Sequence, residues 1–314
     1  MRASDLAPST ADTAVVICTR NRPGMLRAAL ALVAAHTPRD VEVVVVDSAS
    51  GSAETRDIVL AHGYRYVRSD IRGLSIARNL GYAATSRDIV VYTDDDCAAV
   101  EGWVEDLLAG FADAEVGSVT GRMLAEDEAA GDPGPSIRHT STLAGLDAGH
   151  GALMAFRRRL LERLGGFDEL LGAGRHWGGA EDLDMLCRVL DAGSAVREEP
   201  GAIVRHVHTR EDDDLVALYA AYGRGLGAMV NKWQRFRPRA GLALGYRVVG
   251  RSLLRCWRSR ANRRLAPAER AFLRGVVGAW FAAVRHPVRA GRFVDRTPPE
   301  PEPLRIAPTS GAVG

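Results

Sequence analysis

Short apolar runs alternate with amphipathic stretches through the N-terminal part of the chain. The apolar runs at residues 13–18, 41–46 and 88–92 are rich in valine and isoleucine and predict buried strands, and residues 64–67 predict a further short strand. Residues 25–35, 53–62 and 75–84, which lie between or beside these runs, have the pattern of helices. Strands that are apolar on both faces and alternate with helices are typical of a parallel sheet covered on both sides. The expected fold class is α/β, with a Rossmann-like, mostly parallel sheet flanked by helices.

The pattern changes in the second half. Residues 181–190 predict a helix with Leu183, Leu186 and Leu190 on one face and Gly193 as its stop. Residues 196–208 hold an expected turn (EEPG) and a strand that ends in RHVH. From residue 215 onward the chain is helical in pattern and rich in arginine, and residues 295–314, with TPPEPEP, predict an extended, disordered tail.

The balance of charge reverses near residue 214. Residues 1–214 carry 22 basic and 35 acidic residues, a net charge of −13, whereas residues 215–314 carry 19 and 4, a net charge of +15. Such a reversal marks a boundary between regions with different roles. We therefore expect a flexible N-terminus (1–12), an α/β domain (13–214), a basic amphipathic helical extension (215–294) and a disordered Pro-rich tail (295–314).

Composition and the spacing of the cysteines indicate the cellular compartment of the protein. An apolar fraction of 46% and a charged fraction of 25% are typical of a soluble globular protein. The four cysteines form no CxxC pair, which argues against a disulfide framework or a zinc site and predicts a reducing, cytoplasmic environment. No signal pattern starts the chain, and the apolar stretch at residues 275–284 is too short for a bilayer core of about 30 Å.

Three polar loops follow predicted strands: TRNRP, DSASGS and TDDD. Ligands of parallel sheets bind beyond the carboxyl ends of the strands, so one site can use all three loops. Asp94, Asp95 and Asp96 repel one another unless a cation neutralises them, and their oxygens suit Mg²⁺ or Mn²⁺ held together with substrate phosphates. A solvated acidic loop is the alternative, which the position directly after a buried strand disfavours.

A second acidic group stands in the segment WGGAEDLD. Glu181 and Asp182 fall at the start of the predicted helix, where the helix dipole favours negative charge. Taken alone, such residues are more often ordinary caps. Gly178 and Gly179, directly before them, permit a ligand to approach closely, which a cap does not require.

His206 and His208 follow the late strand and point to opposite faces. Imidazole is a good ligand for Mn²⁺ and a poor one for Mg²⁺. Taken alone, a histidine on a strand is more often structural.

Together these segments resemble family 2 glycosyltransferases of the GT-A fold, of the inverting bacterial type. The motifs VVICTRNRP, VVVVDSASGS, GLSIARNLG, YTDDDC, GGFDE, GGAEDLDMLCRVLDAG and EPGAIVRHVH occur in the family's order across residues 13–210. The resemblance extends more weakly into YGRGLGAMVNK. It implies that residues 13–214 form a catalytic domain that binds a nucleotide sugar.

The resemblance also assigns roles. Asp182 is implied as the catalytic base with Glu181 beside it, and Asp96 and His206 as ligands of Mn²⁺ or Mg²⁺. Asp94 is expected to face the ribose, and Arg78 and Asn79 to lie near the base or diphosphate. The full set of implied nucleotide-sugar contacts is Thr19, Asn21, Arg22, Asp47, Ser50, Arg78, Asn79, Asp94 and Asp95. Relatives usually carry an asparagine in the segment GALMAFR where this chain has Leu153, so the sugar and acceptor are less defined than the reaction.

The chemistry fits these residue types. Loss of a nucleoside diphosphate builds negative charge that a metal and arginine stabilise, and a carboxylate base activates the acceptor hydroxyl. A nucleotidyltransferase and a non-catalytic glycan- or membrane-binding relative are the rivals. A nucleotidyltransferase would not need the Glu181–Asp182 pair. A non-catalytic binding protein would be free to lose one of the two acidic motifs or His206.

The partners of the basic extension remain open at this stage. Arg247, Arg251, Arg255 and Arg258 form one stripe of a predicted helix, and Val249, Leu253 and Cys256 lie opposite. Packing against the acidic domain and peripheral contact with an anionic membrane are both consistent with this pattern. Since no recognition motif is present, we expect no nucleic-acid partner.

Overall fold

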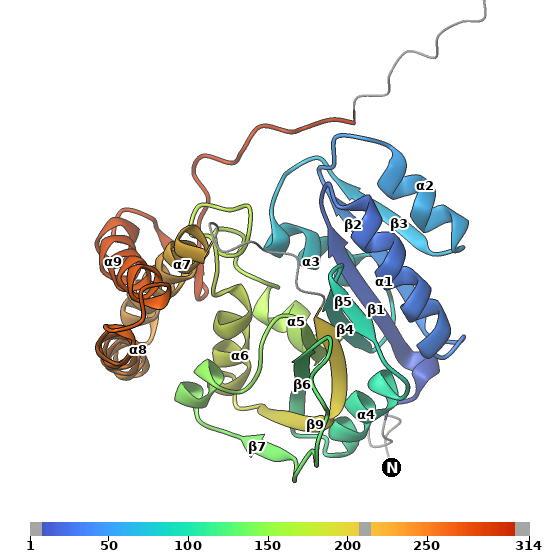
Figure 1. Cartoon of the computed structure of the whole chain (residues 1–314), viewed down its shortest axis with the longest axis horizontal. Helices are drawn as coiled ribbons and strands as arrows, with labels where there is room; N and C mark the ends of the chain where they lie inside the picture. Colours follow the sequence, from blue (N-terminus) through green and yellow to red (C-terminus); the bar gives the residue numbers. More distant parts are fainter. Residues whose placement is uncertain (1–7, 207–214, 305–314) are drawn as a thin grey trace, which may run out of the picture.

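The computed structural model describes residues 8–206 and 215–304. Within these residues, a mixed nine-stranded sheet has the order β3-β2-β1-β4-β8-β6-β9-β5, with β7 paired to β9 (Figure 1). Strands β1 (Thr13–Thr19), β2 (Glu42–Ser48), β3 (Arg65–Ser69) and β4 (Ile89–Asp94) pair in parallel. Helices α1 (Pro23–His36), α2 (Glu54–Ala61) and α3 (Leu74–Ala83) connect them. The α/β class predicted from the sequence is confirmed.

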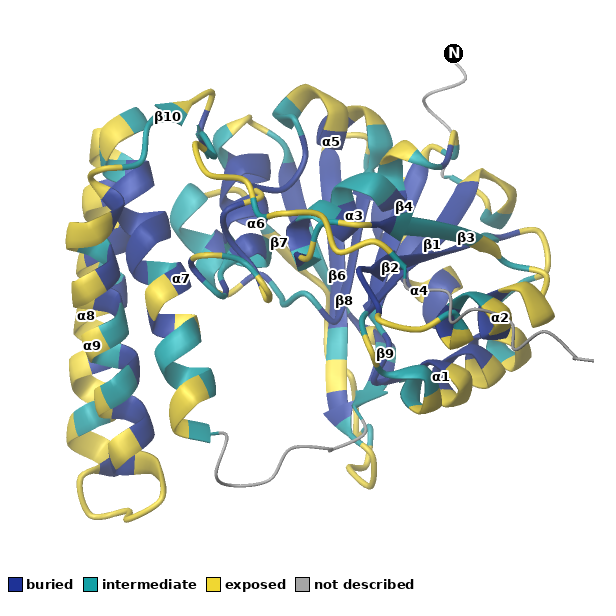
Figure 2. Ribbon diagram, turned by 90° about the horizontal axis from the view of Figure 1, so that it is seen from above, coloured by how far each residue is buried: buried dark blue, intermediate teal, exposed yellow. Residues whose placement is uncertain are grey.

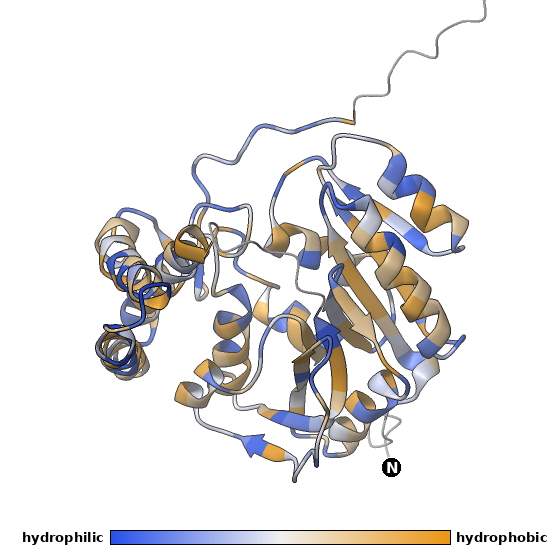
Figure 3. Ribbon diagram, viewed as in Figure 1, coloured by the Kyte–Doolittle hydropathy of each residue, from blue (hydrophilic) through white to orange (hydrophobic). Residues whose placement is uncertain are grey.

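Strands β1, β2 and β4 are buried on both faces because their residues alternate between two cores, whereas β3, at the edge of the sheet, is only partly buried. Val15 and Ile17 of β1 pack with α1 and with α4 (Trp103–Ala109), whereas Val16 and Cys18 pack on the opposite side. There they meet α3, α5 (Arg158–Leu164) and α6 (Glu181–Asp191). These strands are among the most hydrophobic parts of the ribbon in Figure 3. Burial on both faces explains why they read as continuous apolar runs in the sequence.

Strand direction reverses in the second half of the sheet. Strand β8 (Leu153–Arg157) pairs antiparallel with both β4 and β6 (Val116–Ala125), while β9 (Ala195–His206) runs parallel to β6. The short strands β5 (Cys97–Ala99) and β7 (Ile137–His139) add to β9 antiparallel. Short 3₁₀ turns at Thr10–Asp12, Gly110–Ala112 and Thr142–Leu146 complete this part.

The turn expected at EEPG is wrong, because these residues belong to β9. The ladder between β6 and β9 shifts register there: Thr120 pairs with Glu198, and Arg122 pairs with Ile203. A bulge of this kind accommodates Pro200, which lacks the N–H that a regular ladder needs. Strand β9 therefore continues past the bulge to His206.

Three helices form a bundle beside the sheet. Helices α7 (Leu215–Phe236), α8 (Pro238–Ser259) and α9 (Leu265–Ala283) pack on one another, and α7 lies between the others and the α/β part (Figures 1 and 2). A small hairpin, β10 (Val288–Arg289) and β11 (Arg292–Phe293), follows. Among the described residues, no helix combines the length and apolar character needed to cross a bilayer.

Three arginines of the α8 stripe form ion pairs with the protein, whereas the fourth, Arg258, is exposed. Arg247 and Arg251 each approach Asp147 to 2.6 Å, and Arg255 lies 3.0 Å from Glu269. Of the two arrangements left open by the sequence, pairing with the acidic α/β part describes Arg247 and Arg251, whereas Arg255 pairs with Glu269 of α9 within the extension itself. The boundary at residue 214 and His208 lie outside the described residues, so the division into domains stays a prediction.

Candidate active site

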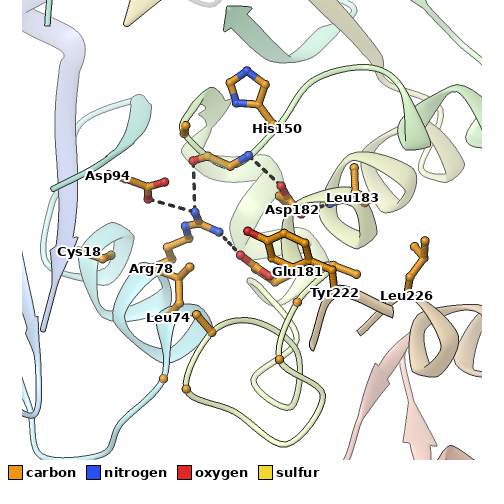
Figure 4. Close-up of a pocket in the computed structure, with 18 of the residues that line it drawn as sticks. Cys18, Leu74, Arg78, Asp94, His150, Glu181, Asp182, Leu183, Tyr222 and Leu226 are labelled. Carbon is orange, nitrogen blue, oxygen red and sulfur yellow. Dashed lines mark hydrogen bonds and ion pairs between the residues drawn. The ribbon is translucent and has the colours of Figure 1, made fainter. Parts of the chain in front are cut away.

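A cavity of about 710 Å³ opens at the carboxyl ends of β1 and β4. Its wall is shared between the sheet loops, the start of α6 and the helical bundle (Figure 4). Eight of the thirteen site residues predicted from the sequence line it: Thr19, Arg22, Arg78, Asp94, Asp96, Glu181, Asp182 and His206. Loops that are distant in sequence therefore meet here, as the parallel topology predicts.

The acidic run after β4 divides between the cavity and the interior. Asp94 and Asp96 line the cavity, whereas Asp95 is fully buried and accepts a hydrogen bond of 2.6 Å from the Thr19 hydroxyl. Arg22 forms ion pairs with both Asp95 and Asp96. Burial raises the pKa of Asp94 to about 6 and that of Asp95 to about 7 although arginines lie nearby. Burial thus disfavours the charged form of both carboxylates, and a bound cation would favour it.

The donor set at this cluster fits a divalent cation. Ligand atoms of Asp94, Asp96 and Cys97 lie within 4.8 Å of one another, and His206 Nε2 lies 3.8 Å from Asp96 Oδ2. Cys97 pairs with His206 across β5 and β9, which fixes the histidine beside the aspartates. Burial raises the pKa of the Cys97 thiol, and its soft sulfur suits Mg²⁺ or Mn²⁺ less well than carboxylate oxygens do. Carboxylate oxygens with one imidazole suit Mn²⁺ well.

Arg78 joins the two acidic motifs. Its guanidinium is 2% exposed, donates to Glu181 Oε1 at 2.8 Å and to the Gly151 carbonyl at 3.2 Å, and lies 3.6 Å from Asp94 (Figure 4). Burial alone would lower its pKa, but the carboxylates of Glu181 and Asp94 outweigh that effect and raise it. A permanent positive charge thus sits in the cavity wall between the acidic cluster and α6.

The start of α6 presents Asp182 to the cavity. Ala180 precedes the helix with φ 66°, a left-handed conformation that costs a residue with a Cβ about 1 kcal/mol or more. Asp182 Oδ2 accepts the Gly151 N–H at 2.8 Å, which orients the carboxylate (Figure 4). Glu181 is buried beside it, and burial together with Asp182 raises the pKa of Glu181 to about 7.

His150 is a cavity residue that the sequence reasoning missed. It lines the cavity next to Gly151, and burial lowers its pKa, so the ring is neutral at pH 7. Its Nδ1 is buried and has no hydrogen-bond partner among the described residues. The segment GHGA, directly before the apolar run of β8, was the only signal that could have drawn attention to it.

Five other predicted residues do not line the cavity but brace its loops. The Asn21 N–H donates to Ser50 Oγ at 2.9 Å, and Asn21 Oδ1 accepts the Gly51 N–H at 2.8 Å. Asp47 is fully buried and accepts from Tyr66 and Arg68. Asn79 bonds to the backbone of Phe167, and Asp95 is held as described above. That Asn21, Asp47, Ser50, Asn79 and Asp95 contact a nucleotide stays a prediction.

The unusual Leu153 is not part of the cavity wall. It is fully buried in the core, whereas the preceding Gly151 and Ala152 line the cavity. The departure from the family pattern therefore changes packing behind the site rather than a side chain in it.

The helical bundle closes the side of the cavity next to α6. Tyr222 and Leu226 of α7, Val248 of α8 and Phe272 of α9 line it, with Arg251 and Arg255 between them. Helix α7 packs directly on the loop before Glu181: a Cβ on Gly179 would lie 3.2 Å from the Tyr222 ring. The bundle is thus a structural part of the site.

The fold resembles those of two solved glycosyltransferases. One is the mannosyltransferase PcManGT from Pyrobaculum calidifontis in complex with GDP-Man and Mn²⁺, at 22% identity and a TM-score of 0.63, covering 88% of this chain and 90% of that chain. The other is GalNAc-T7 with UDP, GalNAc and Mn²⁺, at 20% identity and a TM-score of 0.50, covering 63% of this chain and 43% of that chain. The chain therefore has the GT-A fold that these two glycosyltransferases share.

Sequence comparison gives the family. Residues 14–167 match the family described as Glycosyl transferase family 2. Two curated relatives, the pre-mycofactocin glycosyltransferases of Mycobacterium tuberculosis strains CDC 1551 / Oshkosh and ATCC 25618 / H37Rv, are each 32% identical over 234 residues. These matches cover 69% of this chain, which spans about half (47%) of the relatives' length. The chain belongs to glycosyltransferase family 2.

Proposed function

We propose that this protein transfers a sugar from a nucleotide-sugar donor to an acceptor hydroxyl in one displacement that inverts the sugar carbon. The observation that carries the proposal is the shared cavity wall: Asp182 and the Asp94–Asp96 cluster line the same cavity, and Arg78 joins their two sides. A single displacement needs a base for the acceptor and a positive environment for the leaving group. Both are present, and no second carboxylate nucleophile is required.

The donor side lies at the carboxyl ends of β1 and β4. Thr19, Arg22 and Ser48 line it, and Arg20 and Arg72 add positive charge suited to a diphosphate. Asp96 and His206, with Asp94, are proposed to hold Mn²⁺ or Mg²⁺, which supplies Lewis-acid stabilisation of the diphosphate leaving group. The imidazole favours Mn²⁺ of the two.

Asp182 is the proposed general base. The Gly151 N–H holds one carboxylate oxygen, and the Leu183 N–H holds the other at 2.8 Å, so the group has a fixed orientation. A carboxylate oriented in this way can accept the acceptor's proton as the new bond forms. Glu181 does not act on substrate in this proposal; it pairs with Arg78 and positions the first turn of α6.

The acceptor side is proposed to lie next to the bundle. Tyr222, Leu226, Val248 and Phe272 give this wall an apolar character, which suits an acceptor with apolar surface beside its hydroxyl. The curated relatives' name refers to pre-mycofactocin, and an acceptor of that type is one candidate for this chain. Because all four cysteines are free, a reducing, cytoplasmic location is proposed as well.

The two alternative functions, a nucleotidyltransferase and a non-catalytic binding protein, are less well supported. Family membership favours a glycosyltransferase over a nucleotidyltransferase, which would release pyrophosphate instead of a nucleoside diphosphate. A non-catalytic relative has no need to orient Asp182 with two backbone N–H groups while keeping the acidic cluster intact.

The first test is a thermal-shift screen of UDP, GDP, dTDP and CDP, each with and without Mn²⁺. A ligand that binds the folded state raises the melting temperature, so we expect one nucleotide to give a shift that depends on Mn²⁺. The same screen on Asp57→Asn, an exposed carboxylate on α2, should match the wild type. A metal-independent shift, or no shift with any nucleotide, would contradict the proposed donor site.

A further inference from the structure

An exposed apolar stripe runs along the outer face of α8. Leu242, Tyr246, Val249, Leu253 and Trp257 repeat at intervals of three or four residues, so they lie on one side of the helix. Their exposed fractions are high: 65% for Leu242, 86% for Tyr246, 54% for Leu253 and 61% for Trp257. With a rise of about 1.5 Å per residue, the stripe is roughly 22 Å long. A continuous exposed patch of this kind marks an interaction surface.

The opposite face of the same helix lines the catalytic cavity. Val248, Arg251, Ser252 and Arg255 form that face, and at 100° per residue they lie about half a turn from the stripe. The pairing of Arg251 and Arg255 with Asp147 and Glu269 holds this orientation. Only the thickness of one helix, about 10 Å, therefore separates the stripe from the cavity.

The charges around the stripe are of one sign. No aspartate or glutamate occurs from Leu215 to Ala268. Arg239 lies at the start of α8, and Arg260 and Arg263 are exposed around its end. Arg260 stacks on the Trp257 ring at 4.5 Å, which brings a positive charge to the edge of the stripe.

We propose that this face of α8 docks on an anionic lipid surface, with the stripe in the headgroup–acyl boundary and the arginines on lipid phosphates. A helix with aromatic and aliphatic residues on one side, flanked by arginine, has the composition of interfacial helices. A second copy of the chain fits this face less well, because a two-fold contact would bring the same arginines together without acidic partners. Docking of this kind places the acceptor side of the cavity next to the membrane.

The test is flotation of the full chain with vesicles of phosphatidylglycerol and phosphatidylcholine, compared with vesicles of phosphatidylcholine alone. We expect strong binding to the anionic vesicles and weak binding to the neutral ones. The double variant Leu253→Ser with Trp257→Ser should weaken binding by about tenfold or more, since two apolar side chains leave the interface. Leu60→Ser is the matched control, because Leu60 is equally exposed, at 56%, on α2 of the catalytic domain.

A second set of variants tests how far the arginine charges contribute to vesicle binding. Arg260→Gln with Arg263→Gln should weaken binding to anionic vesicles several-fold, whereas Arg27→Gln with Arg39→Gln on the α/β part should not. Asp182→Asn should bind vesicles like the wild type, so this result is independent of whether the proposed reaction is correct.

Two outcomes would overturn the proposal. One is equal binding, or none, to both kinds of vesicle. The other is a concentration-dependent dimer in sedimentation that Leu253→Ser with Trp257→Ser abolishes, because the stripe would then be covered by a second copy.

Discussion

Lys232 Nζ lies 2.8 Å from Asp184 Oδ2, and both side chains are fully buried. Lys232 is the only lysine of the chain, and it also lies 2.7 Å from Asp168. Asp184 stands two residues after Asp182 on α6, and Asp168 belongs to the GGFDE motif. One ammonium of α7 therefore binds the helical bundle to the helix that carries the proposed base.

We predict that Lys232→Met lowers the free energy of unfolding by about 3 kcal/mol, because buried carboxylates lose their partner. Asp184 keeps Arg188 at 3.0 Å, so the larger loss falls on Asp168. Urea unfolding measures the change. Adding Asp168→Asn to Lys232→Met should recover part of the loss, since it removes the uncompensated charge. A loss below about 1 kcal/mol in Lys232→Met would show that the pair contributes little.

Gly225 permits α7 to touch the loop before Glu181. A Cβ at Gly225 would lie 2.3 Å from the Gly179 carbonyl oxygen, far inside van der Waals contact with backbone. Gly225→Ala should therefore displace α7 or the loop. We expect the free energy of unfolding to fall by about 1–3 kcal/mol and the rate of transfer to fall by about tenfold or more. Gly250→Ala on α8 is the control, because no atom lies within 4 Å of its added Cβ. That control should stabilise the helix by about 0.5–1 kcal/mol. Equal effects of the two changes in urea unfolding and in a transfer assay would refute the close contact.

Strands β1, β2 and β4 were predictable from sequence because they are buried on both faces and so read as uniform apolar runs. The cavity residues after β1 and β4 followed from that topology, since neighbouring parallel strands end at one edge. Strand β9 was harder: Pro200 and Gly201 have the composition of a turn, and only pairing with β6 shows that a bulge absorbs them.

The orientation of the helical bundle was not predictable either. A helical wheel separates the arginines of α8 from its apolar residues but cannot say which face meets the protein. The distant Asp147 and Glu269 decide this by pairing with the arginines. His150 was missed for a similar reason, because its role in the cavity wall depends on contacts across the fold.

Asp182→Asn tests the base. The amide keeps the size of the carboxylate and can still accept the Gly151 N–H, but it cannot take a proton. We expect transfer to fall by 10²–10⁴-fold, with the affinity for nucleotide unchanged within a few-fold. Nucleoside diphosphate release and calorimetric titration measure the two quantities. Asp191→Asn, at the other end of α6, should retain transfer; comparable activity of Asp182→Asn would remove Asp182 from the role.

Asp96→Ala tests the proposed metal site. Loss of this carboxylate removes a hard ligand next to His206, so nucleotide binding should lose most of its dependence on Mn²⁺. A titration of nucleotide with and without Mn²⁺ in wild type and variant measures this dependence. Added chelator should lower wild-type binding to the level of the variant. If the Mn²⁺ effect in Asp96→Ala equals that of the wild type, Asp96 does not bind the metal.

Because the pKa of Glu181 is raised, the difference in stability between the wild type and Glu181→Gln should change with pH. Burial and the neighbouring Asp182 raise this pKa from 4.5 to about 7 against the opposing effect of Arg78. Between these values the folded chain holds a proton that the unfolded chain has lost, so Glu181's contribution to stability falls as pH rises. Glu181→Gln cannot lose a proton, and its melting temperature relative to wild type should rise from pH 4.5 to about pH 7 and then level off. Glu54, exposed on α2, provides the control, and Glu54→Gln should show no such trend. A melting temperature of Glu181→Gln that falls relative to the wild type between pH 4.5 and pH 7 would contradict the raised pKa.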